Sequence, residues 1–446
     1  MNLLYCTIDH ASPIDQFEIA RLRTCFNVTV ITPGDAGPAQ GSTPAQTMQH
    51  GKLFYAGMRL WVKVSTLLAA LPVSNIAQRF SERNVYQKSS LLTHFVNAIW
   101  KIKLAPAVNA RLPNFARLAY LFPFGKRSAR DVIDACKPDL VLYNSLMVTA
   151  YPFIALLKQC KTQHIQRVAN VRSWDNPYYL QFDSSADRYL VWSEFMARTI
   201  SASQHDLKLD AVAWGPNILK NFYNPGSAYR RTARAADSAI NIGYAAAFGE
   251  AHASLAEFRL ISKIANFLNS HGVRCTVLYR PYPTVAIELF LAHQESEHVE
   301  LCCIDANIVD RYGDGRELIR FGTPLEKKRF LDACDLFLSL GTTFTLEAII
   351  HGAPVIHYFL PAEKRLSADE HLIFNRVEIT CDHFDSYFAH CVESITTATE
   401  LIDCIHKMQS SASNHAELLA RIGLDNLASD AQLERLKTPW SHSQAG

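Results

Sequence analysis

No apolar run in this 446-residue sequence is long enough to cross a bilayer as a helix, which takes about 20 predominantly apolar residues. The nearest approach, Trp61–Pro72, contains Lys63. Glycine and proline are scarce, at 18 and 19 residues, which excludes a collagen-like chain or a low-complexity array. Residues 1–10 have the pattern of a strand and lack the charged and apolar regions of a signal peptide, so we expect no leader. A hydrophobic fraction of 49% with 19% charged residues indicates a folded, soluble protein of roughly two or three domains.

The 11 cysteines include no Cys-x-x-Cys pair, the spacing typical of structural zinc sites. The adjacent Cys302 and Cys303 suit neither such a site nor an ordinary disulfide. An odd number of scattered cysteines favours buried, reduced thiols and a cytosolic protein. The sequence also lacks a Walker motif, HExxH, GxSxG, GxGxxG and a DxD-type pair in a plausible loop. We therefore expect neither a bound metal nor a dinucleotide cofactor.

Positive charge is concentrated in one part of the chain. Overall, 44 Lys+Arg nearly balance 42 Asp+Glu, but the segment Gly51–Arg130 holds 13 basic residues and the single acid Glu82. Its net charge is +12, against −10 for the remainder, and large apolar side chains are interleaved with the basic ones. Three interpretations are open: a solvated basic face over ordinary core aromatics, a surface for anionic lipid or a phosphorylated acceptor, or a nucleic-acid surface. No RNP-like, zinc-finger or helix-turn-helix pattern accompanies the charge, so we predict an anionic membrane partner and no nucleic acid.

Short apolar runs alternate with helical patterns over two stretches of the chain. In the first stretch we expect strands at 3–8, 27–32, 140–143, 166–171, 187–192 and 210–213. In the second we expect strands at 239–244, 274–279, 298–303, 336–340 and 354–357. This alternation predicts an α/β fold with two doubly wound, mostly parallel sheets.

Residues 223–238 contain Pro, Gly, Ser and clustered Arg without an apolar period, and we predict that they form the linker between two domains. The N-terminal Rossmann-like domain then covers 1–222 and carries a helical basic insert at about 51–130. The C-terminal Rossmann-like domain covers 239–400, and 401–446 forms C-terminal helices and a tail.

The clearest candidate site follows the expected strand at 336–340. That strand leads into Gly341, Thr342 and Thr343, after which a helix carrying Glu347 begins. Backbone N–H groups at a helix N-terminus, together with two hydroxyl groups, suit a phosphate. Glu347, one turn into the helix, can accept hydrogen bonds from ribose hydroxyls. The alternative is a capped helix in which Glu347 only complements the helix dipole.

This block, which continues into Gly352–Ile356 (GAPVI), resembles the donor-nucleotide segment of GT-B glycosyltransferases and their relatives. In that family a turn of small residues leads into a helix bearing Glu and then into a Gly-x-Pro strand. The resemblance implies two Rossmann-like domains, with the donor nucleotide held by the C-terminal domain and the acceptor by the N-terminal one.

A second resemblance involves Arg280. The segment Tyr279–Pro283 (YRPYP) is similar to the Arg-Pro-His-Pro segment of bacterial surface-polysaccharide transferases, including the glycerophosphotransferase and Kdo-transferase groups. Tyr282 stands where their His contacts phosphate, so Arg280 is the expected phosphate partner, unless it forms a structural salt bridge. Gly249, in the turn after the strand at 239–244, is expected to border the same donor site.

In the N-terminal half, residues 171–194 resemble the Trp-Asp-Asn … Val-Trp-Ser-Glu run of surface-carbohydrate transferases. Asp175 is expected at a strand end, where its carboxylate can act as the general base toward an acceptor hydroxyl or bind sugar hydroxyls. Trp174, Asn176 and Glu194 are then candidates for binding the acceptor. The alternatives are an Asx turn before the following proline for Asp175 and core packing for Trp174.

Asp9 and His10 follow the first expected strand and form a second candidate for the catalytic base. The alternative for this pair is an ordinary turn with a solvated histidine.

Together these features predict a glycosyltransferase that moves a sugar from a nucleotide-sugar donor to a surface-glycan or lipid-linked acceptor, in lipopolysaccharide or capsule synthesis. It would need no metal and no cofactor besides its substrates, because helix N-termini and Arg280 can offset the leaving-group charge. It would act in the cytoplasm, peripherally at the inner face of the cell membrane. The alternatives are a nucleotide-sugar epimerase of the same fold and a non-catalytic membrane-docking scaffold.

Overall fold

A computed structural model gives the architecture of the chain. It describes residues 1–7, 13–33, 46–48, 126–144, 153–172, 186–203, 210–216, 239–282, 285–302, 309–311, 317–319, 324–375, 377, 393–408, 433 and 436–437. The predicted linker 223–238, and all of the predicted basic insert except its last five residues, lie outside the described residues.

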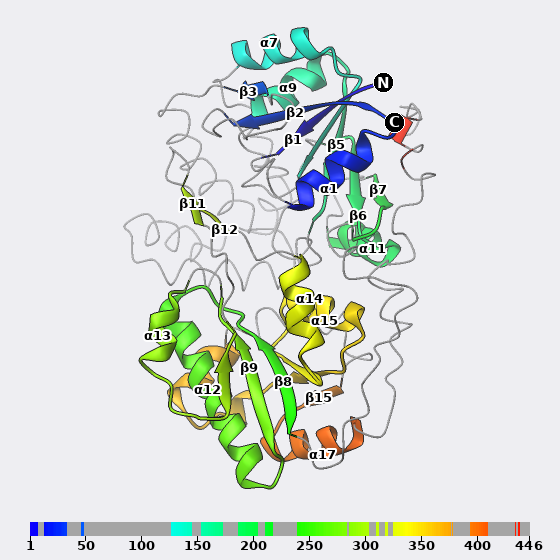
Figure 1. Ribbon diagram of the computed structural model, residues 1–446. Helices are drawn as coiled ribbons and strands as arrows, with labels where there is room; N and C mark the ends of the chain where they lie inside the picture. Colours follow the sequence, from blue (N-terminus) through cyan, green and yellow to red (C-terminus); the bar gives the residue numbers. More distant parts are fainter. Residues whose placement is uncertain are drawn as a thin grey trace, which may run out of the picture. The chain divides into compact units, whose positions relative to one another are not determined.

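In the described part of the chain, the first sheet has seven parallel strands in the order β3-β2-β1-β4-β5-β6-β7 (Figure 1). The strands are β1 Asn2–Cys6, β2 Asn27–Pro33, β3 Gln46–Met48, β4 Leu140–Asn144, β5 Gln166–Asn170, β6 Arg188–Val191 and β7 Ala211–Ala213. The helices between them in sequence are α1 Pro13–Leu22, α7 Lys126–Cys136, α9 Ile154–Thr162 and α11 Glu194–Ser203.

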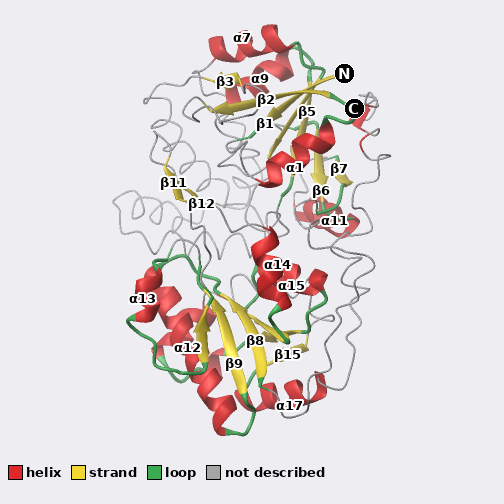
Figure 2. Cartoon of the chain, viewed as in Figure 1, coloured by secondary structure: helices red, strands yellow, loops and turns green. Residues whose placement is uncertain are grey.

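The second sheet has six parallel strands among the described residues, in the order β10-β9-β8-β13-β14-β15 (Figure 2). The strands are β8 Ile240–Ala245, β9 Cys275–Arg280, β10 Val299–Leu301, β13 Leu336–Ser339, β14 Val355–Tyr358 and β15 Glu393–Ile395. The helical segments are α12 Ala251–Ser270, α13 Ile287–Leu291, α14 Pro324–Asp332, α15 Thr343–His351, the 3₁₀ turn η3 Ala362–Lys364 and α17 Ala398–Met408. A separate antiparallel pair joins β11 Val309–Arg311 to β12 Glu317–Ile319.

When the strands of each sheet are counted from its own first strand, both sheets follow the doubly wound order 3-2-1-4-5-6, and the first sheet adds a seventh strand after the sixth. The predicted α/β class with two Rossmann-like sheets is therefore confirmed. Each expected strand has its counterpart, whereas β3, β11, β12 and β15 were not predicted. These four strands are three residues long and, unlike the equally short β7 and β10, do not lie in an apolar run that marks a strand.

The chain divides into two compact units. The first contains Met1–Ile218, Tyr312–Arg316 and Arg421–Gly446, and the second contains Leu219–Arg311 and Glu317–Ala420. Leu433 and Leu436, close to the C-terminus, are buried in the core of the first unit with residues of β1 and β4.

The two sheets begin in the same way. The carbonyl of Asn2 in β1 accepts a hydrogen bond from the Asp139 N–H at 2.9 Å, and the Asn2 N–H donates to the Asp139 carboxylate at 2.7 Å. Asn241 in β8 makes the same two contacts with Asp335, its N–H lying 2.8 Å from the carboxylate. In both sheets the aspartate directly precedes the fourth strand, so each pair joins the first and fourth strands at their amino ends.

A second correspondence lies three residues further along each first strand. The Tyr5 hydroxyl donates a hydrogen bond to Glu18, thirteen residues later in α1. The Tyr244 hydroxyl donates to Glu257, also thirteen residues later, in α12. The same polar contact therefore joins the first strand to the first helix in both units.

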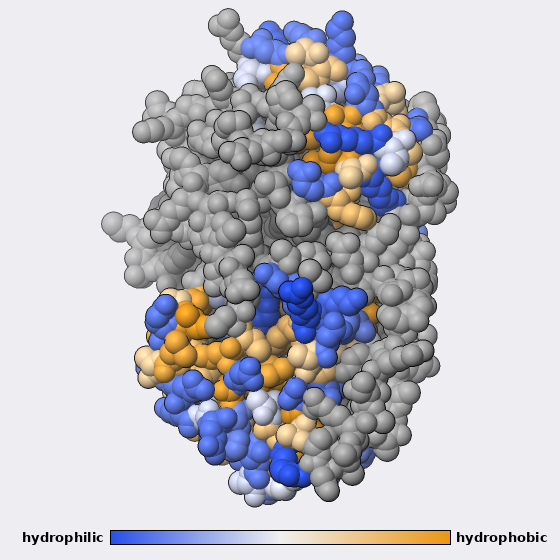
Figure 3. All heavy atoms as spheres, viewed as in Figure 1, coloured by the Kyte–Doolittle hydropathy of each residue, from blue (hydrophilic) through white to orange (hydrophobic). Residues whose placement is uncertain are grey.

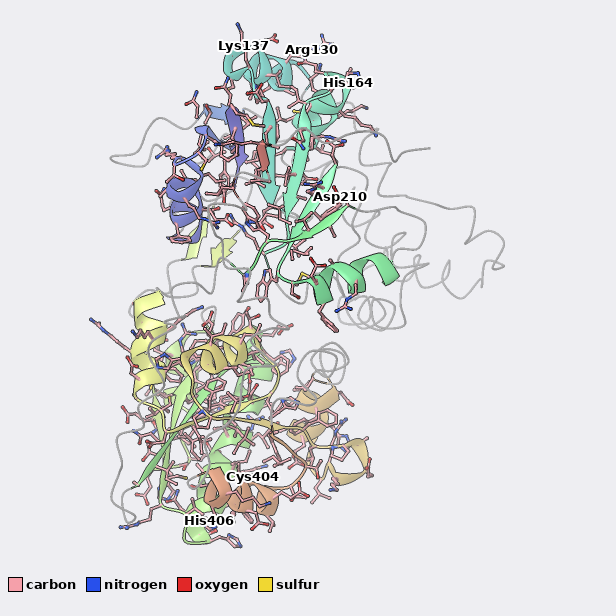
Figure 4. The ribbon with its side chains drawn as sticks, turned by 90° about the vertical axis from the view of Figure 1, so that its right-hand side faces the viewer. Arg130, Lys137, His164, Asp210, Cys404 and His406 are labelled. Carbon is pink, nitrogen blue, oxygen red and sulfur yellow. The ribbon has the colours of Figure 1, made fainter. Side chains whose placement is uncertain are left out.

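Two helices of the first unit end in left-handed residues that are not glycine. Lys137, with φ of 42°, follows α7, and His164, with φ of 58°, follows α9 (Figure 4). The Lys137 N–H donates to the Ile133 carbonyl at 2.7 Å, which satisfies a carbonyl at the helix end. Within the described part of the chain, no helix combines the length and the apolar composition needed to cross a bilayer.

Candidate functional site

The second sheet brings three predicted segments to one edge. In open parallel sheets, ligands bind outside the carboxyl ends of the strands, where the strand order reverses. In this sheet the order reverses between β8 and β13, and β9 lies next to β8. The turn containing Gly249 follows β8, Arg280 ends β9, and Gly341 follows β13. These segments therefore lie side by side at the carboxyl edge.

The turn after β13 requires glycine. Gly341 has a φ of 91°, in the left-handed region that favours a residue without Cβ. Its N–H donates to the Ser339 hydroxyl oxygen at 2.9 Å, and that hydroxyl also shares a hydrogen bond with Thr345. The turn is thus held by α15 itself, which begins at Thr343 and ends before the left-handed Gly352.

Thr342 occupies the N-cap position of α15 without capping it. Its backbone is extended, with φ of −90° and ψ of 164°, as N-cap residues are. Its side chain makes no capping hydrogen bond, and Oγ1 is buried with no partner in the described part of the chain. A cap threonine normally accepts a hydrogen bond from the first turn of its helix. This hydroxyl is therefore available to a ligand at the positive end of α15.

Arg280 is a buried cation. The residue is 6% exposed, and its Nη2 has no hydrogen-bond partner among the described residues. Burial lowers the pKa of Arg280, while the carboxylates of Glu347 and Glu326 act in the opposite direction. The guanidinium carbon lies 5.0 Å from the centroid of the Phe344 ring, a cation–π arrangement. The expected alternative, a salt bridge, is not formed with any described carboxylate.

Glu347 has one oxygen engaged and one without a partner. The residue is 4% exposed and lies in the second turn of α15. Its Oε1 accepts a hydrogen bond from Lys327 Nζ of α14 at 2.6 Å. Its Oε2 is buried and has no partner among the described residues. A buried carboxylate oxygen in this state can accept a hydrogen bond from a hydroxyl group of a ligand.

Phe344 connects the two cations. Lys327 Nζ lies 5.7 Å from the ring centroid, and Phe337 stacks on the ring at 5.5 Å. The cluster thus contains the cations Arg280 and Lys327 and the carboxylate of Glu347 beside a helix N-terminus, and the Glu326 carboxylate also acts on Arg280. Lys327 is engaged by Glu347, whereas the buried Nη2 of Arg280 has no described partner and, beside the helix N-terminus, favours an anion. A nucleotide carries both kinds of group that this site can bind, an anionic phosphate and, next to it, a ribose with hydroxyl donors.

The turn after β8 is also fixed by a buried group. Glu257 in α12 is fully buried, and its Oε1 accepts hydrogen bonds from the Tyr244 hydroxyl and, at 2.8 Å, from the Ala247 N–H. Burial raises the pKa of Tyr244 well above its usual range, and Glu257 raises it further. These contacts fix the backbone at Ala247, two residues before Gly249. The sequence analysis did not select Glu257, because a glutamate within an apolar helical pattern has no distinguishing local signal.

The donor-site residues predicted from sequence are brought together, and their binding role stays a prediction. Arg280, Gly341, Thr342, Thr343 and Glu347 lie at one edge of one sheet. Lys327 was missed. It is one of three consecutive basic residues on α14, and no local pattern distinguishes it from the other two.

The candidate catalytic residues of the N-terminal half are Asp9, His10 and Asp175, and they lie outside the described residues together with Trp174 and Asn176. Their roles stay predictions. Glu194 is described, and it is the exposed first residue of α11. The helix is capped by the preceding Ser193, whose Oγ accepts a hydrogen bond from the Met196 N–H at 3.2 Å.

The first unit contains a buried polar network that the sequence analysis did not predict. Arg172, two residues after the end of β5, donates through Nη2 to Asp15, to Tyr5 and, at 2.6 Å, to Glu18. Asn170 donates to the other Glu18 oxygen at 2.6 Å. Two carboxylates and one guanidinium are thereby held at the carboxyl edge of the first sheet. The spacing of Asp15 and Glu18, three residues apart in α1, is the signal that could have revealed this network.

Comparisons with known proteins identify similar structures only. No protein-family model matches the chain, and no curated protein sequence matches it. The structure is similar to UDP-GlcNAc 2-epimerase from Methanocaldococcus jannaschii, with 10% identity and a TM-score of 0.48 over 98% of this chain and 99% of that one. It is similar to sucrose-phosphate synthase from Thermosynechococcus elongatus, with 10% identity and a TM-score of 0.47 over 98% of both chains. It is also similar to Acinetobacter baumannii MurG, with 11% identity and a TM-score of 0.44 over 98% of both chains.

Proposed function

We propose that this protein is a nucleotide-sugar-dependent glycosyltransferase of the GT-B type. The observation that carries the proposal is the set of buried polar atoms without partners at the carboxyl edge of the second sheet: Arg280 Nη2, Thr342 Oγ1 and Glu347 Oε2. Buried polar groups are normally hydrogen-bonded, and three exceptions around one helix N-terminus indicate a ligand site.

The chemistry of the three groups matches a nucleotide. Arg280, the Thr342 hydroxyl and the N-terminus of α15 would hold the phosphate, and Glu347 Oε2 would accept a hydrogen bond from a ribose hydroxyl. When the bond to the sugar breaks, negative charge develops on the phosphate oxygen. Arg280 and the helix N-terminus would stabilise that charge, so the transfer would need no metal ion.

The acceptor would bind to the first unit. We propose Asp175 as the general base that removes the proton from the acceptor hydroxyl, with Asp9 or His10 as the second choice. Trp174, Asn176 and Glu194 of the same segment would contact the acceptor. This assignment rests on the sequence resemblance described above.

We further propose a surface-glycan or lipid-linked acceptor in polysaccharide synthesis, and a peripheral position at the cytoplasmic face of the membrane. The charge of +12 in Gly51–Arg130 supports this part of the proposal, because anionic headgroups attract basic residues.

The test is thermal unfolding in the presence of UDP, CMP, GDP or CDP. A nucleotide at about 100 times its Kd stabilises the folded protein by about 2.7 kcal/mol, which raises the Tm measurably. We expect Glu347→Ala to weaken the binding of that nucleotide by about 1–3 kcal/mol, as for a hydrogen bond to a charged group. Glu288→Ala, on the exposed face of α13, is the matched control and should bind like the wild type.

Two outcomes would contradict the proposal. The nucleotide site is wrong if none of the four nucleotides raises the Tm, or if folded Glu347→Ala binds with unchanged affinity. The assignment as a transferase is wrong if the protein converts a nucleotide-sugar to a free sugar or an epimer at the same rate with and without acceptor.

A further inference from the structure

Lys327 differs from its neighbours on α14. Its side chain is 16% exposed, whereas Lys328 and Arg329 are exposed to solvent. The outer surface at α14 is accordingly hydrophilic (Figure 3). Of these three consecutive cations, Lys327 is the one that reaches Glu347.

The contact engages only half of the Glu347 carboxylate. Lys327 Nζ lies 2.6 Å from Oε1, while Oε2 stays buried without a partner in the described part of the chain. The lysine therefore compensates the charge of the carboxylate and fixes its orientation, yet leaves the second oxygen for a ligand. Because this geometry exists before binding, a ligand hydroxyl would not have to order the carboxylate.

Two further contacts hold Lys327 in place. Its Nζ lies over the Phe344 ring at 5.7 Å. At the end of the same helix, Asp332 Oδ1 lies 2.9 Å from Nε2 of His351, one turn beyond Glu347 on α15. Helices α14 and α15 are thus joined by two polar pairs, and the position of Lys327 follows from their packing.

We propose that Lys327 is a positioning residue that gives this site its preference for the ribose diol of a nucleotide over a deoxyribose. The proposal rests on the function proposed above, in which Glu347 binds the sugar of the nucleotide. A deoxynucleotide that lacks the bound hydroxyl leaves Oε2 unsatisfied, and sites built around a buried polar group reject such analogues strongly. Without Lys327, the carboxylate is no longer held with Oε2 toward the ligand and can turn away from it, so the penalty for a missing hydroxyl decreases.

The experiment measures calorimetric affinities for the ribonucleotide that binds best among UDP, CMP, GDP and CDP, and for its 2′-deoxy and 3′-deoxy analogues. The wild type should prefer the ribonucleotide over one or both analogues by about ten- to a hundredfold, the range for a hydrogen bond to a charged group. Lys327→Met should reduce this preference to below about threefold. Lys327→Arg keeps the cation and should retain the preference, and Lys328→Met is the matched control with the wild-type preference.

Affinity for inorganic pyrophosphate separates positioning from general damage. The pyrophosphate affinity should change by less than about threefold in Lys327→Met, because in the proposed site the phosphate groups bind to Arg280 and the α15 N-terminus. If Lys327→Met does not fold, Lys327→Gln takes its place, because its amide can still donate to Oε1. Its preference for the ribonucleotide should be smaller than that of the wild type but still measurable.

The results distinguish the two proposals. If the wild type binds a ribonucleotide but Lys327→Met, or Lys327→Gln in its place, retains the full preference, the role of Lys327 is refuted and the nucleotide site stands. A wild type that binds the ribonucleotide and both analogues equally also refutes it. A wild type that binds no nucleotide refutes the proposed function itself.

Discussion

The guanidinium of Arg280 lies over the ring of Phe344, its carbon 5.0 Å from the ring centroid, and Nη2 has no partner among the described residues. The residue ends a central strand, 6% exposed, and faces no described counter-ion at salt-bridge distance. A buried cation in this state lowers the stability of the folded protein. Its position is better explained by a ligand than by stability.

The first prediction follows from the destabilising effect of the buried charge of Arg280. We expect Arg280→Met to leave the free energy of unfolding unchanged or to raise it by about 1–3 kcal/mol, because a buried charge is replaced by an apolar side chain of similar length. Nucleotide binding should weaken at least tenfold. Urea denaturation and calorimetry measure the two effects.

Arg259→Met is the control for this substitution. Arg259 pairs with Asp369 at 2.6 Å on a partly exposed surface, so its loss should lower stability slightly and leave nucleotide affinity unchanged. If Arg280→Met instead lowers stability while nucleotide binding persists, Arg280 belongs to a structural ion pair.

The second prediction concerns pH. Burial in β14 lowers the pKa of His357 to about 4, although a hydrogen bond with the backbone of Ser339 acts in the opposite direction. The unfolded chain binds a proton near pH 6.5, while the folded chain binds it only near pH 4. The free energy of unfolding therefore falls as the pH decreases through this window, by about 3 kcal/mol in total from this residue.

Urea denaturation at several pH values between 4 and 7 tests this prediction. The pH dependence should be clearly weaker in His357→Gln than in the wild type, whereas His252→Gln on the exposed start of α12 should behave like the wild type. Equal pH dependence in the wild type and His357→Gln would show that the histidine does not carry the effect.

The third prediction concerns the catalytic base, which lies outside the described residues. Asp175→Asn keeps the shape of the side chain but removes its basicity, so turnover should fall by about a hundredfold or more while donor affinity persists. Steady-state kinetics and calorimetry check the two parts, with Asp134→Asn on the exposed face of α7 as a control. Near-normal turnover in Asp175→Asn would transfer the role to Asp9 or His10.

The fourth prediction concerns the basic segment. With a charge of +12 in Gly51–Arg130, the protein should sediment with vesicles containing anionic lipid, less with neutral vesicles, and be partly released at high salt. Joint charge reversal should reduce vesicle binding without changing nucleotide affinity; the four substituted residues are Lys101, Lys103, Lys126 and Arg127. A protein that ignores anionic vesicles at low salt would mark the segment as a solvated or acceptor-binding face.

Local sequence was sufficient for every strand of the two sheets except β3 and β15. The run Leu336–Leu340, apolar except for Ser339, predicts β13, because a strand covered on both faces needs a nearly continuous apolar run. Gly341 and Gly352 mark both ends of α15 because each adopts a left-handed φ, near 90°, that side chains with a Cβ disfavour. These are properties of single residues and their neighbours, and for that reason they can be read without the fold.

The short strands β3, β11, β12 and β15 were not predictable, and neither was the packing of the C-terminal segment into the core of the first unit. Leu433 and Leu436 are buried in the first core, but two leucines in a polar stretch have no local signal. What orders them is the apolar surface of β1 and α1, which is hundreds of residues away in sequence and is formed only when the first unit folds.

The candidate site depended on the tertiary structure in the same way. Arg280 and Phe344 meet because β9, β8 and β13 are ordered side by side, although the two residues are 64 positions apart. The rotation of α14 then selects Lys327 from three adjacent cations, because successive helical residues point about 100° apart. The sequence determined which groups were available for the site. Only the packing of strands and helices decided which of them are buried together and left without partners.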